Sequence, residues 1–389
     1  MHIVVAQPAR SSADSFAEVF QALGCLKRYL IWARTTPPWL KRELLVTNLG
    51  WGALRALGPI LLPAKLGESW QYFLHPAFGR WAARHVEPGD AVFSSFGYCN
   101  EAFRKARRLG GTTLYNAGNS HPQFMWDILT EEHARWNVRA DPFLRRQLEQ
   151  ALEMVGLTDY FFCPSSFVRQ SFAGKGFAPD RLLTAARTFN PQLFKPAEQP
   201  GRPGPFRVVC PGGVGLRKGT VYLLQAFEKL RREFKDCELI LTHSIREDAR
   251  PVIRPYHHLV TWVDAMDHAG LARFFQGSDV YVLPSLEEGL ARTGLEAMAC
   301  GVPVIVTPNT GVNDYVVEGR NGFVVPIRDP QAIFEKLLWL ATHPEARQEM
   351  GRAAALAMQQ LRPERFAETV AAGLQTISAS RTGPHQVRA

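Results

Sequence analysis

The sequence predicts an α/β protein made of two Rossmann-like, doubly wound domains. Its 389 residues exceed what a single hydrophobic core usually supports. Short apolar runs that fit buried parallel strands alternate with amphipathic helical segments along most of the chain. A stretch rich in proline and glycine at 196–205 (PAEQPGRPGP) separates two such series. We therefore expect an N-terminal domain at 1–196 and a C-terminal domain at 203–361.

The first series begins with a strand in MHIVVAQPAR, a start that lacks the basic and apolar segments of a signal peptide. Further strands are expected at 91–96 and 112–117, with a basic helix between them. The second of these strands leads into the polar residues 118–121. A helix should begin near Pro122, because proline favours the first helical turn. His121 then stands where a strand ends and a helix begins, a position that suits either a structural or a functional histidine.

Residues 41–66 (KRELLVTNLGWGALRALGPILLPAKL) are strongly apolar and have basic ends. Arg55, Pro59 and three glycines make a bilayer-spanning helix unfavourable. The mixture of Trp, Leu, Lys and Arg is typical of helices that lie in a membrane interface. A helical hairpin that packs on the sheet explains the same pattern. Both interpretations stay open at the level of sequence.

The second series starts with a strand at 207–210, which a glycine-rich loop, 211–219, and an amphipathic helix, 220–234, follow. Further strands are expected at 238–242, 261–263, 280–283, 302–306 and 322–326. This alternation predicts a parallel sheet with helices on both faces.

The formal net charge is +9, and the excess lies mainly in the first half of the chain. Residues 1–200 hold 23 of the 45 Lys and Arg but only 16 of the 36 Asp and Glu. A basic surface attracts anionic lipid, nucleic acid or phosphorylated substrates. The six cysteines are scattered without a C-x-x-C pair, which is typical of reduced thiols in a cytosolic protein.

Two carboxylates follow one of the expected strands. Ligands of parallel sheets bind beyond the carboxyl ends of the strands, where helix N-termini present free N–H groups. Glu288 lies in the loop after strand 280–283, and Glu296 lies on a helix expected to start near Arg292. Helical rise of ~1.5 Å per residue and the loop separate the two carboxylates by on the order of 10 Å. A diphosphate with a sugar at each end spans that distance, although solvated surface positions would also explain both residues.

The glycine-rich loop PGGVGLRKG contains Gly212, Gly213, Arg217 and Lys218. It lacks the third glycine of G-x-G-x-x-G, and it is no P-loop because Lys218 precedes Gly219. We expect its backbone to approach a phosphate closely, with the two cations neutralising the charge. The sequence has no D-x-D, H-E-x-x-H or cysteine cluster, so no metal is expected.

Two segments, PSLEEGLARTGLEAMACGVPVIV and RKGTVYLLQAF, resemble the retaining glycosyltransferases of family 4. Glu288 and Glu296 match the E-x7-E signature of that family. The resemblance covers roughly residues 112–330, and it implies the GT-B fold, in which two Rossmann-like domains face a cleft. It also implies that a last helix, at 363–378, crosses back onto the first domain.

In the first domain, NSHPQFMWDILTEE is similar to a family segment whose loop faces the donor sugar across the cleft, which implies a catalytic position for His121. Matches to the family pattern further along are Asp159, Pro164, Ser165, Val168, Arg169, Phe172, Phe194 and Pro196. Thr188 and Asn190 depart from it, because they stand where the family has the Gly and Asp of a G-V-D turn.

In the second domain, the resemblance implies a donor site. Its implied members are Gly212, Gly213, Arg217, Lys218, Glu288, Gly289, Leu290, Ala291, Arg292, Glu296, Thr310 and Gly311. Glu296 is expected to accept hydrogen bonds from ribose hydroxyls, and Glu288 to hold the sugar. Lys218 and Arg217 are expected to bind the diphosphate, and Lys218 and Glu288 are expected, with His121, to be catalytic.

The donor loops depart from the family pattern at three positions. Gly213 stands where many members have a second phosphate-binding arginine, so Arg217 or Arg292 should supply that charge. Leu290 and Ala291 replace the Phe-Gly of the usual E-G-F-G loop, which restricts the approach of the backbone to a phosphate.

The expected function is a metal-independent, retaining transfer of a hexose-type sugar from a nucleotide-diphosphate sugar to an acceptor hydroxyl, without a cofactor. A glycan or lipid-linked acceptor in cell-surface polysaccharide or glycolipid synthesis is expected, and no nucleic acid. The expected location is cytoplasmic, and the basic first half favours peripheral contact with the inner membrane face. The alternatives are a non-catalytic protein that binds sugar nucleotides or glycans, and a sugar-nucleotide epimerase of similar fold.

Overall fold

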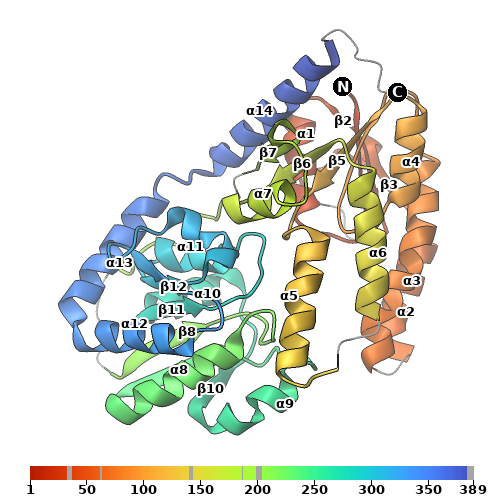
Figure 1. The fold of residues 1–389 in the computed structure, drawn as a ribbon. Helices are drawn as coiled ribbons and strands as arrows, with labels where there is room; N and C mark the ends of the chain where they lie inside the picture. Colours follow the sequence, from red (N-terminus) through yellow and green to blue (C-terminus); the bar gives the residue numbers. More distant parts are fainter. Residues whose placement is uncertain (33–36, 62–63, 140–142, 186, 199–203, 383–389) are drawn as a thin grey trace.

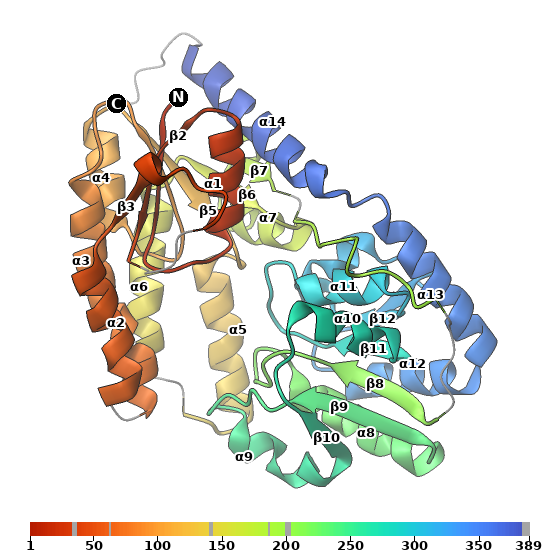
Figure 2. The ribbon, with the colours of Figure 1, turned by 180° about the vertical axis from the view of Figure 1, so that it is seen from behind.

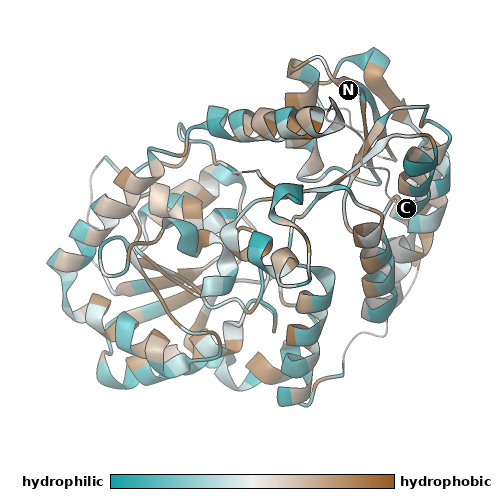
Figure 3. Ribbon diagram, turned by 45° about the horizontal axis from the view of Figure 1, so that its top comes forward, coloured by the Kyte–Doolittle hydropathy of each residue, from teal (hydrophilic) through white to brown (hydrophobic). Residues whose placement is uncertain are grey.

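The computed structural model describes residues 1–32, 37–61, 64–139, 143–185, 187–198 and 204–382. These residues form two α/β domains, each with one parallel sheet between helices (Figure 1). The pair of Rossmann-like domains predicted from the sequence is thereby confirmed. Figure 3 shows that the strands are mostly hydrophobic, whereas hydrophilic residues lie along the helices.

The N-terminal sheet has seven strands in the order β3-β2-β1-β4-β5-β6-β7, and every neighbouring pair is parallel. Its strands are β1 (Ile3–Gln7), β2 (Leu26–Ile31), β3 (Leu45–Thr47), β4 (Ala91–Ser94), β5 (Thr112–Asn116), β6 (Tyr160–Cys163) and β7 (Leu182–Thr184). Ile3 and Val5 of β1 face one hydrophobic cluster, and Val4 faces another. The strand is therefore apolar on both faces, as parallel sheets covered by helices require.

Helices cover both faces of this sheet. They are α1 (Ala13–Ala22), α2 (Leu49–Leu61), α3 (Ala64–Ala83), α4 (Asn100–Arg108), α5 (Pro122–Arg135), α6 (Phe143–Gly156) and α7 (Ser166–Ala173). Phe16 of α1 packs on one face, against Phe93 of β4 and Phe162 of β6. Phe103 of α4 and Met154 of α6 belong to the cluster on the other face. Figure 2 shows α1 on the side of the sheet away from α3 and α4.

Residues 49–61 of the apolar stretch form α2, which makes a helical hairpin with α3, so the hairpin interpretation is confirmed for the helical part. Residues 45–47 instead form the strand β3, which the sequence did not predict. α2 packs along α3, and α3 packs in turn along α4. Trp51 of α2 stacks on the buried Trp32 with ring centroids 5.1 Å apart. The outward side of α2 nevertheless leaves apolar side chains exposed, namely Leu54, Leu57, Ile60 and Leu61.

The C-terminal sheet has six parallel strands in the order β10-β9-β8-β11-β12-β13. They are β8 (Phe206–Cys210), β9 (Cys237–Thr242), β10 (Val260–Val263), β11 (Val280–Leu283), β12 (Val304–Val306) and β13 (Gly322–Val324). The helices are α8 (Thr220–Glu233), α9 (Arg250–Ile253), α10 (His268–Gln276), α11 (Arg292–Ala299), α12 (Pro330–Thr342) and α13 (Pro344–Met358). All six strands lie where the sequence predicted them, within two residues at each end.

Two of the strand ends that differ from prediction do so for identifiable local reasons. β4 ends at Ser94, two residues early, because Phe96 (φ 53°) and Gly97 (φ 75°) turn the chain through the left-handed region. β12 begins only at Val304, because Pro303 has no N–H group to donate to a neighbouring strand.

Two helices tie the domains together. α14 (Pro363–Thr382) returns from the C-terminal domain and packs on α1, β6 and β7 of the first domain. α5 lies between the domains (Figure 1), and its Ile128 is part of the hydrophobic core of the C-terminal domain. Phe189 and Phe194, which follow β7, are buried in the same core. The carboxyl ends of the two sheets are thereby held face to face.

Candidate active site

The loop after β5 and the loop after β11 touch across the domain interface. A Cβ atom on Gly289 would lie only 1.8 Å from the carbonyl oxygen of Gly118, so the approach requires glycine. Ser165, at the end of β6, donates its hydroxyl to the carbonyl of Gly289 at 2.6 Å. Gly311 (φ 73°) packs against the same loop, because a Cβ atom on it would lie only 2.7 Å from the carbonyl oxygen of Gly289. Gly289 and Gly311 of the predicted donor site therefore shape the interface itself.

Glu287, which the sequence analysis did not select, holds this interface together. Its carboxylate is fully buried and accepts hydrogen bonds from the Ser120 N–H and hydroxyl, both at 2.9 Å. The Asn119 amide and Arg217 also donate to it. The acidic pair Glu287–Glu288 was visible in the sequence, but the partner loop that surrounds Glu287 comes from the other domain.

Glu288 lies beside the two cations of the glycine-rich loop. Its Oε1 atom is 3.0 Å from Arg217 Nη1 and 2.5 Å from Lys218 Nζ. Burial raises the pKa of the Glu288 carboxyl, but Arg217 and Lys218 outweigh burial and hold that pKa below its usual value. The structure thus brings three predicted site residues together. The charges of Arg217 and Lys218 are balanced by Glu287 and Glu288.

The glycine-rich loop reaches this position through a left-handed turn. Gly219 has φ 63°, and a Cβ on it would lie 2.0 Å from the Pro284 carbonyl oxygen. Gly212 (φ 118°) donates its N–H to the Thr242 hydroxyl at the end of β9. Gly213 lies next to Ser244, in the loop that follows β9. The loop therefore runs along the carboxyl edge of the sheet, as predicted.

The N-terminus of α11 points its N–H groups into the same region. Leu290 and Ala291 are buried, and the Ala291 N–H donates to the Thr310 carbonyl at 3.1 Å. In contrast, the N–H groups of Arg292 and Thr293 donate to no group of the described residues. Free N–H groups at a helix start favour an anion, because the helix dipole adds partial positive charge.

Glu296 lies one turn further along α11. Its side chain is only 4% exposed, yet it forms neither a hydrogen bond nor an ion pair with any described residue. Burial raises the pKa of its carboxyl, and the charges of Arg292 and His268 lower it by less. Buried carboxylates in proteins are normally paired. This one therefore has unused capacity to accept hydrogen bonds from a ligand.

Two arginines near this helix have no counter-ion. Within the described parts of the chain, Arg187 and Arg292 make neither an ion pair nor a side-chain hydrogen bond. Arg187 comes from the segment after β7, and its Nη2 atom lies beside Gly118. Burial, and then the charge of Arg292, lower the pKa of Arg187 to about 10. Arg292 was predicted from the sequence, but Arg187 was not, because its proximity to α11 depends on the fold.

His121 lies at the domain interface, but its ring is directed into the first domain. Its Nδ1 atom accepts the Gln123 N–H at 3.1 Å and caps α5. The ring packs against Phe172 and Phe177, with centroid distances of 5.1 and 5.8 Å. The side chain is 5% exposed, and burial lowers its pKa to about 4. Its expected position near the reacting carbon stays a prediction.

The buried His121 leads to a testable pH dependence. Its pKa is depressed in the folded state, so the unfolded chain binds a proton that the folded chain does not once the pH falls below about 6.5. The contribution of neutral His121 to the free energy of unfolding is complete above pH 6.5, and it is lost as the pH falls towards about 4. At pH 5.5 the loss amounts to about 1.4 kcal/mol for this group.

Replacing His121 with asparagine isolates this contribution, because asparagine is also a good helix cap but does not titrate. The unfolding free energy of the wild type and of His121→Asn should both be measured at pH 7.5 and at pH 5.5. We expect the decrease between the two pH values to be about 1.4 kcal/mol smaller in His121→Asn than in the wild type. Urea titrations at both pH values measure it. An identical pH dependence in both proteins would show that folding does not lower the pKa of His121.

No group of three or more His, Cys, Asp or Glu side chains in the described residues is arranged to hold a metal ion. Among the helices of the described residues, none combines the length and the apolar composition needed to span a membrane.

The sequence around these site residues is similar to sequences of known proteins. Residues 205–343, which contain Arg217, Lys218, Arg292 and both predicted carboxylates, match a family model described as Glycosyl transferases group 1. D-inositol 3-phosphate glycosyltransferase of Pseudarthrobacter chlorophenolicus is 30% identical over 165 residues, which are 40% of this chain and 39% of the relative. The chain therefore spans less than half the length of this curated relative.

Solved structures match over nearly the whole chain. Sucrose-phosphate synthase from Thermosynechococcus elongatus superimposes with a TM-score of 0.72 at 18% identity, covering 98% of this chain and 100% of that one. Anabaena Alr3699/HepE, solved in complex with UDP, gives a TM-score of 0.66 at 14% identity and covers 97% and 100%. The chain thus has the GT-B fold that the sequence predicted.

Proposed function

We propose that the protein is a glycosyltransferase that moves a sugar from a nucleotide-diphosphate sugar to the hydroxyl group of a glycan or lipid-linked acceptor. One observation carries the proposal. Glu296 is a buried carboxylate without a partner among the described residues, one helical turn from free N–H groups and from Arg292. A ligand that pairs with both the Glu296 carboxylate and the cationic start of α11 has hydroxyl donors at one end and a phosphate at the other. A nucleoside diphosphate has both.

The charges nearby support a place for the diphosphate. Arg217 is engaged by Glu287 and Glu288, so it is the weaker candidate for the missing family arginine. Arg292 has no carboxylate partner in the described chain, and Arg187 approaches it from the first domain. We assign the diphosphate to Arg187, Arg292, Lys218 and the start of α11. Negative charge that develops on the leaving diphosphate would be stabilised there.

Finer features of the reaction rest on the resemblance to family 4. They are retention of the anomeric configuration, a hexose-type sugar, independence from metal and cofactor, and a role in cell-surface polysaccharide or glycolipid synthesis. In this assignment Glu296 accepts from the ribose hydroxyls and Glu288 holds the sugar. Three cations near the diphosphate supply the positive charge for which other transferases use a metal.

A thermal-shift screen of nucleoside diphosphates and their sugars tests the proposal. A ligand present at 100 times its Kd stabilises the folded protein by ~2.7 kcal/mol. Glu296→Gln should weaken the best nucleotide by ~1.5–3 kcal/mol, because a charged acceptor becomes a neutral amide. Glu345→Gln, at an exposed position of α13, is the control. If no nucleoside diphosphate stabilised the wild type, the proposal would be wrong.

Donor hydrolysis separates an enzyme from a binding protein. A transferase releases nucleoside diphosphate and free sugar slowly even without acceptor, and a binding protein releases neither. An epimerase would instead interconvert donor sugars. NMR of the product anomeric proton, once an acceptor is found, decides between retention and inversion.

We further propose peripheral contact with the inner membrane face through α2. The exposed apolar residues of this helix include Ile60 and Leu61, which are 75% and 71% exposed. Lys41 and Arg42, both exposed, precede the helix. Insertion of these apolar side chains into the membrane interface, combined with about 1 kcal/mol of attraction per well-placed Lys or Arg, gives reversible binding to anionic lipid.

Sedimentation with anionic vesicles checks this membrane contact. We expect binding at low salt that weakens with added salt and in the Ile60→Glu and Leu61→Glu variants. Leu356→Glu, which changes an equally apolar exposed residue of α13, should bind as the wild type does. Wild-type protein that stays in the supernatant at low salt would contradict the proposal.

A further inference from the structure

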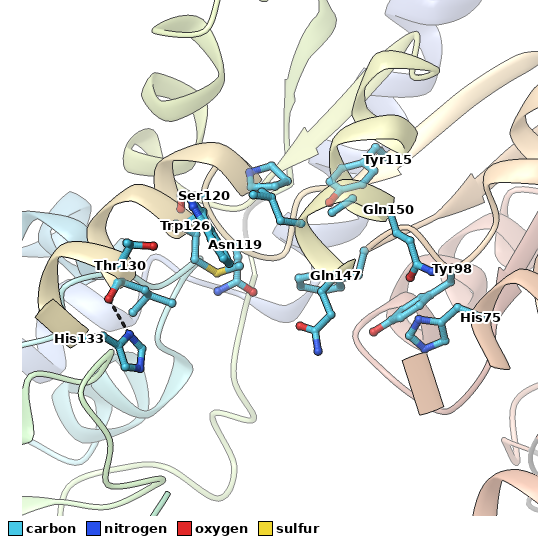
Figure 4. A pocket seen from close by; sticks show the side chains of 16 residues that line it. His75, Tyr98, Tyr115, Asn119, Ser120, Trp126, Thr130, His133, Gln147 and Gln150 are labelled. Atoms are coloured by element: carbon cyan, nitrogen blue, oxygen red, sulfur yellow. Dashed lines mark hydrogen bonds between the residues drawn. The ribbon is translucent and has the colours of Figure 1, made fainter. Parts of the chain in front are cut away.

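A cavity in the first domain adjoins the proposed donor site. It lies at the carboxyl ends of β4 and β5, between α5 on one side and α3 and α6 on the other, with a volume of about 230 Å³. Figure 4 shows Asn119 and Trp126 on the first side and His75, Tyr98 and Gln147 facing them. The volume far exceeds the ~10–15 Å³ that a single water needs, so a small molecule fits.

One end of the cavity reaches the interface between the domains. Asn119 and Ser120 line it, and both donate hydrogen bonds to Glu287, the neighbour of Glu288. A molecule bound in this cavity would therefore have one end close to the loop assigned to the donor sugar. The position suits an acceptor, and this inference rests on the proposed function.

The lining contains no Lys, Arg, Asp or Glu among the described residues. His75 is neutral, because burial lowers its pKa to about 3. His133 lies 3.5 Å from Asp248, whose carboxylate raises the pKa of His133 and balances any charge on it. A phosphate or carboxylate buried here would find no cation in the lining itself, because Arg55, whose charge acts on His75, and Arg187, beside Gly118, are not part of it. A buried unpaired charge is strongly disfavoured.

Flat apolar surfaces and amide groups make up much of the lining. Its aromatic side chains are Phe96, Tyr98, Tyr115 and Trp126, and its amide side chains are Asn119, Gln147 and Gln150. The Gln147 side chain has no hydrogen-bond partner among the described residues. An amide both donates and accepts, which matches a hydroxyl group. An alkyl chain would leave the Gln147 amide unsatisfied, whereas a sugar offers hydroxyls at its rim and C–H groups on its faces.

We infer that this cavity binds the acceptor through an uncharged sugar ring, with Trp126 and Gln147 as specificity-determining residues. The absence of a cation from the described lining disfavours a phosphorylated sugar. A lipid or a longer glycan attached to that ring would extend out of the cavity.

Saturation-transfer NMR tests the inference with defined probes. These are the methyl glycosides of glucose, galactose, mannose and N-acetylglucosamine, with glucose 6-phosphate and octanol for comparison, each with and without the best nucleoside diphosphate. We expect at least one methyl glycoside to bind, and glucose 6-phosphate to bind no more tightly than methyl glucoside. Gln147→Ala and Trp126→Ala should each weaken that glycoside about ten-fold.

Glu149→Ala, an exposed position on α6 beside Gln147, is the matched control and should bind as the wild type does. Tighter binding of glucose 6-phosphate or octanol, no binding of any methyl glycoside, or equal affinity in all variants would overturn the inference. Nucleoside diphosphate affinity, measured in the same samples, reports on the proposed function separately. A chain that binds the nucleotide but no neutral sugar refutes the acceptor assignment alone.

Discussion

Replacing Lys218 with alanine is expected to lower kcat by a factor of about 10²–10³, the usual cost of removing one group that stabilises charge in a transition state. Lys218 Nζ contacts Glu288, and the lysine side chain is still 21% exposed. Negative charge on the leaving diphosphate grows as the sugar departs, so the loss should appear in kcat more than in KM. Steady-state kinetics with the identified donor measure both.

Three further measurements separate a phosphate role from a structural one. Lys218→Arg keeps the charge and should lose much less activity than Lys218→Ala. Lys229→Ala removes an exposed lysine from α8, whose partner is Gln331, and should leave activity unchanged. Without Lys218, the pKa of Glu288 rises, so the acid limb of the rate profile should move to higher pH. Equal rates for the alanine and arginine variants would argue against the phosphate role.

The second domain was predictable from sequence because its signals are local. Each strand there is a short apolar run, and Asp329 caps α12 just where a polar residue precedes Pro330. β2 of the first domain was missed, since Lys27 and Arg28 interrupt its apolar pattern. The structure shows why the strand tolerates them: Lys27 pairs with Asp90, and Arg28 with Glu87.

The residues of the candidate site also fall into two groups, those with local sequence signals and those that depend on contacts between the domains. Lys218, Glu288 and Glu296 lie in local segments that follow predicted strands, and the resemblance to family 4 rests on the same segments. Glu287 and Arg187 were missed because their roles depend on a second domain. In the sequence, Glu287 resembles a solvated loop residue, because its partners Asn119 and Ser120 belong to the other domain. No periodicity in the sequence indicates that Arg187 lies near α11.

Arg328→Met is expected to destabilise the docking of α5 by about 3–5 kcal/mol, the usual cost of removing one member of a buried ion pair. Arg328 follows β13, and its Nε lies 2.7 Å from Oε2 of the fully buried Glu132. Tyr222 and Trp136 donate to the other oxygen of Glu132, at 2.7 and 2.8 Å. Without Arg328, only these neutral donors would remain to stabilise a buried carboxylate between the domains. Urea unfolding, followed by tryptophan fluorescence, measures the loss.

A double variant decides whether the unpaired charge is the cause. Glu132→Gln combined with Arg328→Met removes both charges, and we expect it to recover most of the stability that Arg328→Met alone loses. Lys336→Met breaks the more exposed pair with Glu318 on the same domain, and it should cost less than about 1 kcal/mol. If Arg328→Met were no more destabilising than Lys336→Met, Glu132 would not depend on Arg328. The domains would then be held mainly by apolar packing around Ile128 and by α14.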